Sequence, residues 1–135
     1  MTRRVAGLAE IVLWVHDMEA ALHFYRDGFG LELISPSELP NKFLRAGQGG
    51  AGVPEMLVLV PHPDPMVEFP REKAKRVLHH MAFRVEARAY DDLQLHFMTE
   101  GVEIRTGVHP LLKGARTFYV DDPDGNEVEV ISPAP

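Results

Sequence analysis

The segment most informative about the fold lies near the end of the chain and reads RTFYVDDPDGNEVEVIS, residues 116–132. Segments rich in β-branched and aromatic residues flank Asp122-Pro123-Asp124-Gly125, a sequence typical of tight turns, so the stretch predicts a β-hairpin. Side chains alternate between the two faces of a strand, which puts Glu127 and Glu129 on one face and Val128 and Val130 on the other.

The residues before this hairpin predict a strand, a helix and an extended segment, at 79–85, 89–99 and 102–106. The first half of the chain repeats this order with a strand at 8–16, a helix that follows Asp17 and ends at Gly28, and extended segments at 31–35, 42–46 and 56–60. A glycine-rich loop is expected between the last two. Glu10 of the first copy corresponds to His80 of the second.

This repeat predicts an α+β fold of two βαβββ modules that form a cupped, mostly antiparallel sheet. The whole chain, 1–135, is expected to be a single domain, with module one at 8–61, a linker at 62–78 and module two at 79–132. The linker is rich in proline and then in charged residues, and its charged run is expected to be solvated.

Composition excludes several classes of function. The 135-residue chain has a net charge of −6 and no run of basic residues, so neither nucleic acid nor an anionic membrane is expected as a partner. No apolar stretch is long enough to span a bilayer and no signal peptide is recognisable. The absence of cysteine excludes disulfides and thiolate ligands and suits a cytoplasmic protein, which is the expected location.

Strand periodicity predicts which polar side chains line the open face of the cup. Glu10, His80 and Glu129 fall on the mixed faces of three different strands, whereas the opposite faces are apolar. His79 is expected on the face opposite His80. Taken singly, a strand glutamate is usually solvated and a strand histidine is usually a satisfied polar residue, so the three positions alone do not establish a site.

Three segments resemble the vicinal oxygen chelate superfamily, which includes glyoxalase I, fosfomycin-resistance thiol transferases, extradiol dioxygenases and bleomycin-resistance proteins. They are Thr117–Val130, His80-Met81-Ala82-Phe83, and Val15-His16-Asp17-Met18 with the following Phe24-Tyr25 and Gly30-Leu31-Glu32. The resemblance implies paired βαβββ modules around a divalent metal, a small-molecule substrate and a homodimer. The modules would pair either within one chain or across two chains.

The same resemblance implies the metal ligands. Glu10 occupies the first-strand position that usually holds histidine, while His80 and Glu129 occupy the second-module positions. A fourth position falls among the apolar residues 57–59, so three protein ligands would remain. Two carboxylates and one imidazole favour harder ions, Fe²⁺, Mn²⁺ or Mg²⁺, with Zn²⁺ also open. A metal-dependent dioxygenase, lyase or isomerase acting on vicinal oxygens is therefore expected, with the dioxygenase favoured.

Three further residues are candidates for catalysis. Tyr119 would bind substrate or act as an acid, His109 would act as an acid or base from the loop at 107–115, and Arg84 would pair with an anionic substrate. The alternative hypothesis is a metal-free protein of the bleomycin-resistance type that sequesters ligands. It rests on the missing first-strand histidine and on the apolar fourth position.

Overall fold

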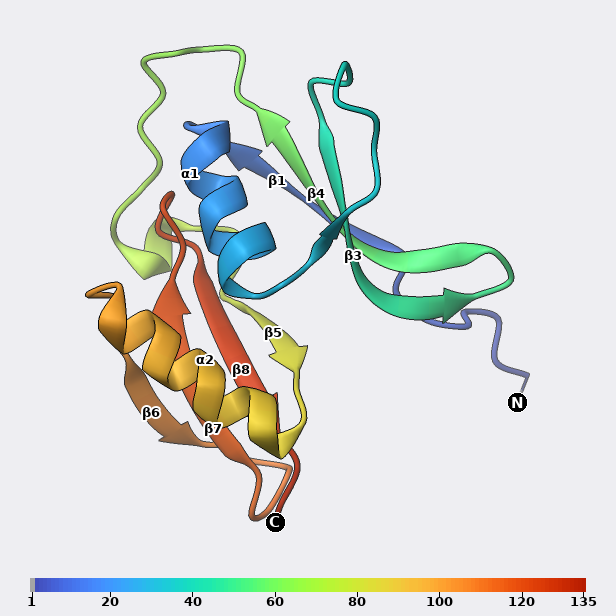
Figure 1. Cartoon of the computed structure of the whole chain (residues 1–135), viewed down its shortest axis with the longest axis vertical. Coiled ribbons are helices and arrows are strands. Elements are labelled where there is room, and N and C mark those ends of the chain that lie inside the picture. The colour runs from blue at the N-terminus through green and yellow to red at the C-terminus, as the bar shows by residue number, and fades with distance from the viewer. Residues whose placement is uncertain (1) are drawn as a thin grey trace. The chain divides into compact units, whose positions relative to one another are not determined.

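A βαβββ unit occurs twice in the computed structural model, which describes residues 2–135 (Figure 1). The elements of the first unit are β1 (Glu10–Val15), α1 (Met18–Leu22), the π-helical segment η1 (His23–Gly28), β2 (Glu32–Leu33), β3 (Lys42–Gly50) and β4 (Val53–Pro61). Those of the second are the 3₁₀ turn η2 (Lys73–Lys75), β5 (Met81–Arg84), α2 (Ala87–Thr99), β6 (Arg105–Val108), β7 (Arg116–Asp121) and β8 (Glu127–Ser132). The chain divides between Val67 and Glu68 into these two compact units.

Each unit holds one four-stranded mixed sheet, and the two sheets have the same topology. The strand orders are β1-β4-β3-β2 and β5-β8-β7-β6. The first pair in each order is parallel and the other two pairs are antiparallel. The predicted α+β class, the repeated βαβββ order and the mostly antiparallel pairing are confirmed.

The helix of the first unit begins where the sequence places its cap. The Asp17 carboxylate accepts a hydrogen bond from the backbone N–H of Ala20 at 3.2 Å, which satisfies an otherwise unpaired donor of the first turn. α1 continues as η1 to Gly28, and the buried rings of Phe24 and Tyr25 lie in this continuation. Their burial anchors the helix to its own sheet.

The core of the second unit forms where α2 covers its sheet (Figure 1). Tyr90 and Phe97 lie on the buried face of α2, and their ring centroids are 5.0 and 6.4 Å from that of Phe118 on β7. Leu93 completes this helical face, as its spacing predicts. Val128 and Val130 on β8 are fully buried, so the apolar face of the hairpin packs under the helix.

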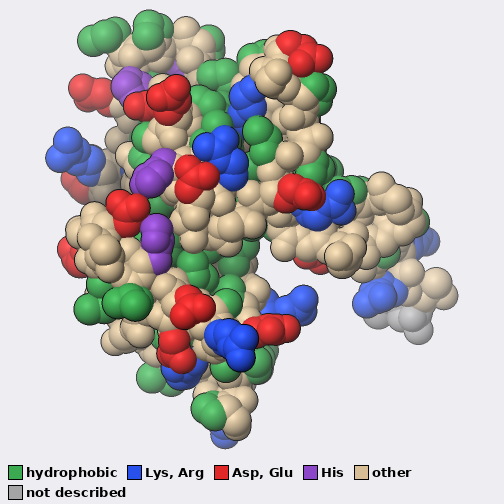
Figure 2. All heavy atoms as spheres, viewed as in Figure 1, with side chains coloured by type: hydrophobic (Ala, Val, Ile, Leu, Met, Phe, Trp, Pro, Cys, Tyr) green, Lys and Arg blue, Asp and Glu red, His purple; other side chains and the backbone are tan. Residues whose placement is uncertain are grey.

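The predicted alternation along the strands is confirmed. On β1, Leu13 and Val15 are buried, while Val12 and Trp14 on the other face are each 52% exposed. Apolar side chains accordingly appear among charged ones on the surface in Figure 2. Across residues 2–135, no helix combines the length and hydrophobicity that a membrane span requires.

Two expectations about loops are wrong. The expected glycine-rich loop belongs largely to β3, which continues to Gly50, and only Ala51 and Gly52 separate it from β4. Register shifts at Gly47 and Gly50 and the positive φ of 63° at Gly49 allow β3 to stay paired with β4 along this irregular segment. Glycine here accommodates bulges within the strand rather than ending it.

The second wrong expectation is that the charged run of the predicted linker is solvated. Lys73 contacts Glu127, and Arg76 contacts Asp124 and Asn126, so this part of the run packs on the second unit and is not simply solvated. Lys73 and Arg76 pack there because the turn region at 121–127 offers them carboxylate and carbonyl oxygens as hydrogen-bond acceptors.

Candidate functional site

His80 and Glu129 lie side by side in the second unit. Glu129 is on β8 and only 2% exposed, and its Oε1 is 3.0 Å from Nε2 of His80. The pair forms because β5 and β8 are adjacent parallel strands, with Ala82 opposite Glu129. His80 lies just before β5, two residues ahead of Ala82, and its imidazole reaches the Glu129 carboxylate.

The other carboxylate oxygen of Glu129 has no hydrogen-bond partner among the described residues, although it is buried. A buried carboxylate oxygen without a hydrogen-bond partner is costly, and a cation bound there would offset that cost. Nitrogen from histidine and oxygen from a carboxylate are ligands of Zn²⁺, Mn²⁺ and Fe²⁺. These residues therefore fit a divalent ion.

His79 lies beside His80, contrary to its expected position on the opposite face. The two Nδ1 atoms are 2.7 Å apart and the ring centroids 5.0 Å apart. Both residues precede β5, which begins at Met81, so the pleat of the strand does not separate their side chains. His79 thus holds the Nδ1 edge of His80 while Glu129 faces the Nε2 edge, an arrangement that fixes the orientation of a ligating imidazole.

Glu127 lies near the two histidines but has other partners. One ligand atom from each of His79, His80 and Glu127 lies within 4.8 Å of the others. However, Glu127 accepts hydrogen bonds from Lys73 and from Arg105. Burial raises the pKa of Glu127, but these two cations lower it by more, so the net pKa lies below its ordinary value. Because Glu127 already neutralises two cations, Glu129 is the better carboxylate for a metal.

Tyr119 joins the same cluster from β7. It is opposite Glu129 in the ladder, and its ring centroid is 5.9 Å from that of His80. Burial raises the pKa of the Tyr119 phenol, and the nearby negative charge of Glu129 raises it further. The phenol therefore keeps its proton at neutral pH and can donate it.

The other predicted site residues are Glu10, Arg84 and His109. Glu10 is exposed at the start of β1 in the first unit, where it pairs with Met56 of β4. Arg84 is exposed at the end of β5. Nδ1 of His109 accepts the backbone N–H groups of Leu111 and Leu112 at 3.1 and 3.0 Å. Among the residues that the structure describes, neither Arg84 nor His109 hydrogen-bonds to His80 or Glu129.

Sequence reasoning missed His79 and Glu127 as neighbours of the site. Two signals were available: the consecutive histidines at 79 and 80, and the alternation that puts Glu127 and Glu129 on one face of one strand. Neither signal shows that His79 turns toward its neighbour, because that depends on where β5 starts.

Solved structures with this fold come from several organisms. A glyoxalase/dioxygenase from Nostoc punctiforme has a TM-score of 0.75 and 21% identity, with 98% of this chain and 94% of that chain covered. A fosfomycin resistance protein from Listeria monocytogenes has a TM-score of 0.66 and 24% identity, with 96% and 95% covered. A lactoylglutathione lyase from Agrobacterium tumefaciens has a TM-score of 0.65 and 25% identity, with 96% of each chain covered.

The family match covers both βαβββ units. The model of the Glyoxalase/Bleomycin resistance protein/Dioxygenase superfamily matches residues 7–130, which include the His80–Glu129 pair and nearly all of the repeated fold. The chain belongs to the Glyoxalase/Bleomycin resistance protein/Dioxygenase superfamily.

Proposed function

We propose that this protein is a divalent-metal-dependent enzyme that acts on a small molecule through two adjacent oxygen atoms. The observation that carries the proposal is the Glu129 carboxylate, which is buried beside His80 with one oxygen unpaired. A cation bound by both side chains would remove the cost of this unpaired oxygen. Glu10 is proposed as the third ligand, from the family position that it occupies.

The bound ion would polarise the substrate oxygens and stabilise negative charge that develops on them. The chain's own residues would supply the other functions. Tyr119 keeps a protonated phenol beside Glu129 and would donate a hydrogen bond or a proton to a substrate oxygen. His79 would hold the imidazole of His80 in a fixed orientation through its Nδ1 edge.

The ligand set narrows the reaction class. One imidazole and two carboxylates favour Mn²⁺, Fe²⁺ or Mg²⁺ over softer ions, with Zn²⁺ still compatible. Three protein ligands would leave the ion accessible to a chelating substrate and one further small molecule. This arrangement supports a reaction like that of an extradiol dioxygenase. A glyoxalase-like lyase or isomerase reaction is the alternative within this proposal.

Metal content tests the proposal. The protein would be stripped with a chelator, reconstituted separately with Fe²⁺, Mn²⁺, Zn²⁺ and Mg²⁺, desalted and analysed for metal. We expect one tightly held ion per chain in the wild type and in a His96→Ala control. His96 lies on α2, pairs with Glu100 and has no part in the site. His80→Ala and Glu129→Ala should lose the ion. Equal retention of metal by all four proteins, or no metal in the wild type, would refute the proposal of a metal-dependent enzyme.

One observation favours a second candidate function, a metal-free protein that sequesters an apolar ligand. Leu8, Val12 and Trp14 leave 77%, 52% and 52% of their surfaces exposed at the start of the first unit. Such an apolar face would suit a bulky aromatic ligand. Quenching of the fluorescence of Trp14, the one tryptophan of the chain, by aromatic ligands without any bound metal would support this candidate.

A further inference from the structure

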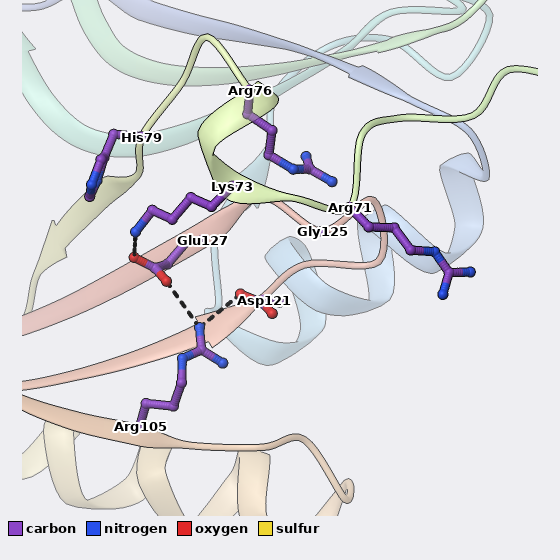
Figure 3. A pocket seen from close by; sticks show the side chains of 8 residues that line it. All are labelled: Arg71, Lys73, Arg76, His79, Arg105, Asp121, Gly125 and Glu127. Carbon is purple, nitrogen blue, oxygen red and sulfur yellow. Dashed lines mark hydrogen bonds and ion pairs between the residues drawn. The ribbon is translucent and has the colours of Figure 1, made fainter.

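The second unit contains a pocket whose basic side chains have no part in the proposed metal site (Figure 3). Its charged lining consists of Arg71, Lys73, Arg76 and Arg105 with Asp121 and Glu127. Four basic side chains against two acidic ones leave two positive charges in excess there, although the chain as a whole has a net charge of −6. A local excess of this sign in an acidic protein attracts anions.

The two carboxylates of the pocket are already neutralised. Glu127 accepts hydrogen bonds from Lys73 and Arg105, and Arg105 also donates to Asp121 at 2.8 Å, as the dashed lines in Figure 3 show. These contacts engage Lys73 and Arg105. The excess positive charge therefore belongs to the other two cations, Arg71 and Arg76.

Arg76 is held in place by neutral oxygen atoms. Its guanidinium donates to the backbone carbonyl of Asp124 at 2.9 Å and to the side-chain oxygen of Asn126 at 3.5 Å. Its Nε is buried and has no hydrogen-bond partner among the described residues. A side chain on Gly125 would intrude on this position, because a Cβ built there lies 2.5 Å from Nη2 of Arg76. The turn thus keeps space for a guanidinium that still has an unsatisfied donor.

Arg71 is the other cation of the pocket that neither Asp121 nor Glu127 contacts. It is exposed, and it makes no hydrogen bond or ion pair with any residue in the described part of the chain. Guanidinium groups match tetrahedral oxyanions well because they present several N–H donors in a planar fork. Two such groups at one pocket suit a ligand with two negative charges.

We propose that this pocket binds a tetrahedral oxyanion of the phosphate type, with Arg71 and Arg76 as its principal contacts. The binding does not depend on a metal, so it goes beyond the proposed function. His79 lines the same pocket and lies 2.7 Å from His80 between their Nδ1 atoms. If the proposed function holds, the pocket would receive an anionic group of the substrate beside the metal.

Titration with inorganic phosphate tests the proposal on metal-stripped, full-length protein at low ionic strength, followed by calorimetry and by amide NMR shifts. We expect saturable binding in the wild type and about tenfold weaker binding in Arg71→Gln and in Arg76→Gln. Arg88→Gln removes an equal charge from an exposed position on α2 and should bind phosphate as the wild type does. Malonate, a dicarboxylate, serves as the comparison anion and should bind more weakly than phosphate.

Three results would overturn the proposal: no saturable phosphate binding by the wild type, an equal loss in Arg88→Gln, or malonate binding as tight as phosphate. Misfolding does not confuse the test, because Arg71 is exposed and makes no hydrogen bond or ion pair with the described residues whose loss would unfold the protein. Since metal has been removed beforehand, the result is independent of whether His80 and Glu129 bind an ion.

Discussion

Replacement of Gly125 by alanine should have two separable effects, one on the backbone and one on Arg76. Gly125 has φ +82°, and Gly101, at the end of α2, has φ +75°. An L-residue in this left-handed region costs about 1–2 kcal/mol at either position. The two sites differ in their surroundings: an added Cβ meets nothing within 4 Å at Gly101, but lies 2.5 Å from Nη2 of Arg76 at Gly125.

The expected difference follows from the bonds that Arg76 would lose. The guanidinium is the flexible end of its side chain, so it can move away from the new methyl group, but it then loses its 2.9 Å hydrogen bond to the Asp124 carbonyl. One such hydrogen bond contributes about 1 kcal/mol. We therefore expect Gly101→Ala to lower the free energy of unfolding by about 1–2 kcal/mol, and Gly125→Ala to lower it by about 1 kcal/mol more.

Urea unfolding followed by circular dichroism measures both variants against the wild type, and phosphate titration of the same samples reports on the pocket. Gly125→Ala should weaken phosphate binding, whereas Gly101→Ala should not. Equal destabilisation of the two variants together with equal phosphate affinity would refute the argument that the turn positions Arg76.

Three further predictions follow from the core and the site. Phe118→Ala empties a fully buried position between Tyr90 and Phe97 and should lower the free energy of unfolding by about 3–5 kcal/mol, as measured in urea. Burial raises the pKa of the Tyr90 phenol above its ordinary value. The contribution of the protonated phenol to the free energy of unfolding is therefore fully present below about pH 10, and it is lost as the pH rises through the folded-state pKa. Tyr90→Phe should flatten this alkaline loss in unfolding experiments, and an unchanged slope would contradict it. Glu10→Gln should reduce metal retention while changing the free energy of unfolding by less than about 0.5 kcal/mol, because Glu10 is exposed.

The fold could be predicted from the sequence because its signals are local. The turn at Asp122–Gly125, the cap at Asp17 and the helical face of Tyr90, Leu93 and Phe97 each depend on neighbouring residues, and the structure confirms them. Strand alternation also predicted that His80 and Glu129 project to the same side, and two adjacent parallel strands bring them to 3.0 Å.

The corrections concern features that depend on distant or marginal contacts. Lys73 and Arg76 meet the hairpin about fifty residues later in the chain, and no local pattern distinguishes such contacts from solvated charges. His79 turns toward His80 because β5 starts after both residues, and strand boundaries are the least predictable part of a sequence reading. Gly47 and Gly49 stay within β3 because bulges accommodate them.

A crystal structure of the Mn²⁺-loaded protein, with the metal located by anomalous scattering, would show whether His80 and Glu129 bind a divalent ion. We predict one anomalous peak bonded to Nε2 of His80 and to the Glu129 carboxylate at about 2.1–2.2 Å, with Glu10 as a further ligand. A peak held by His79 and Glu127 without Glu129, or no peak in either unit, would contradict the proposed metal site.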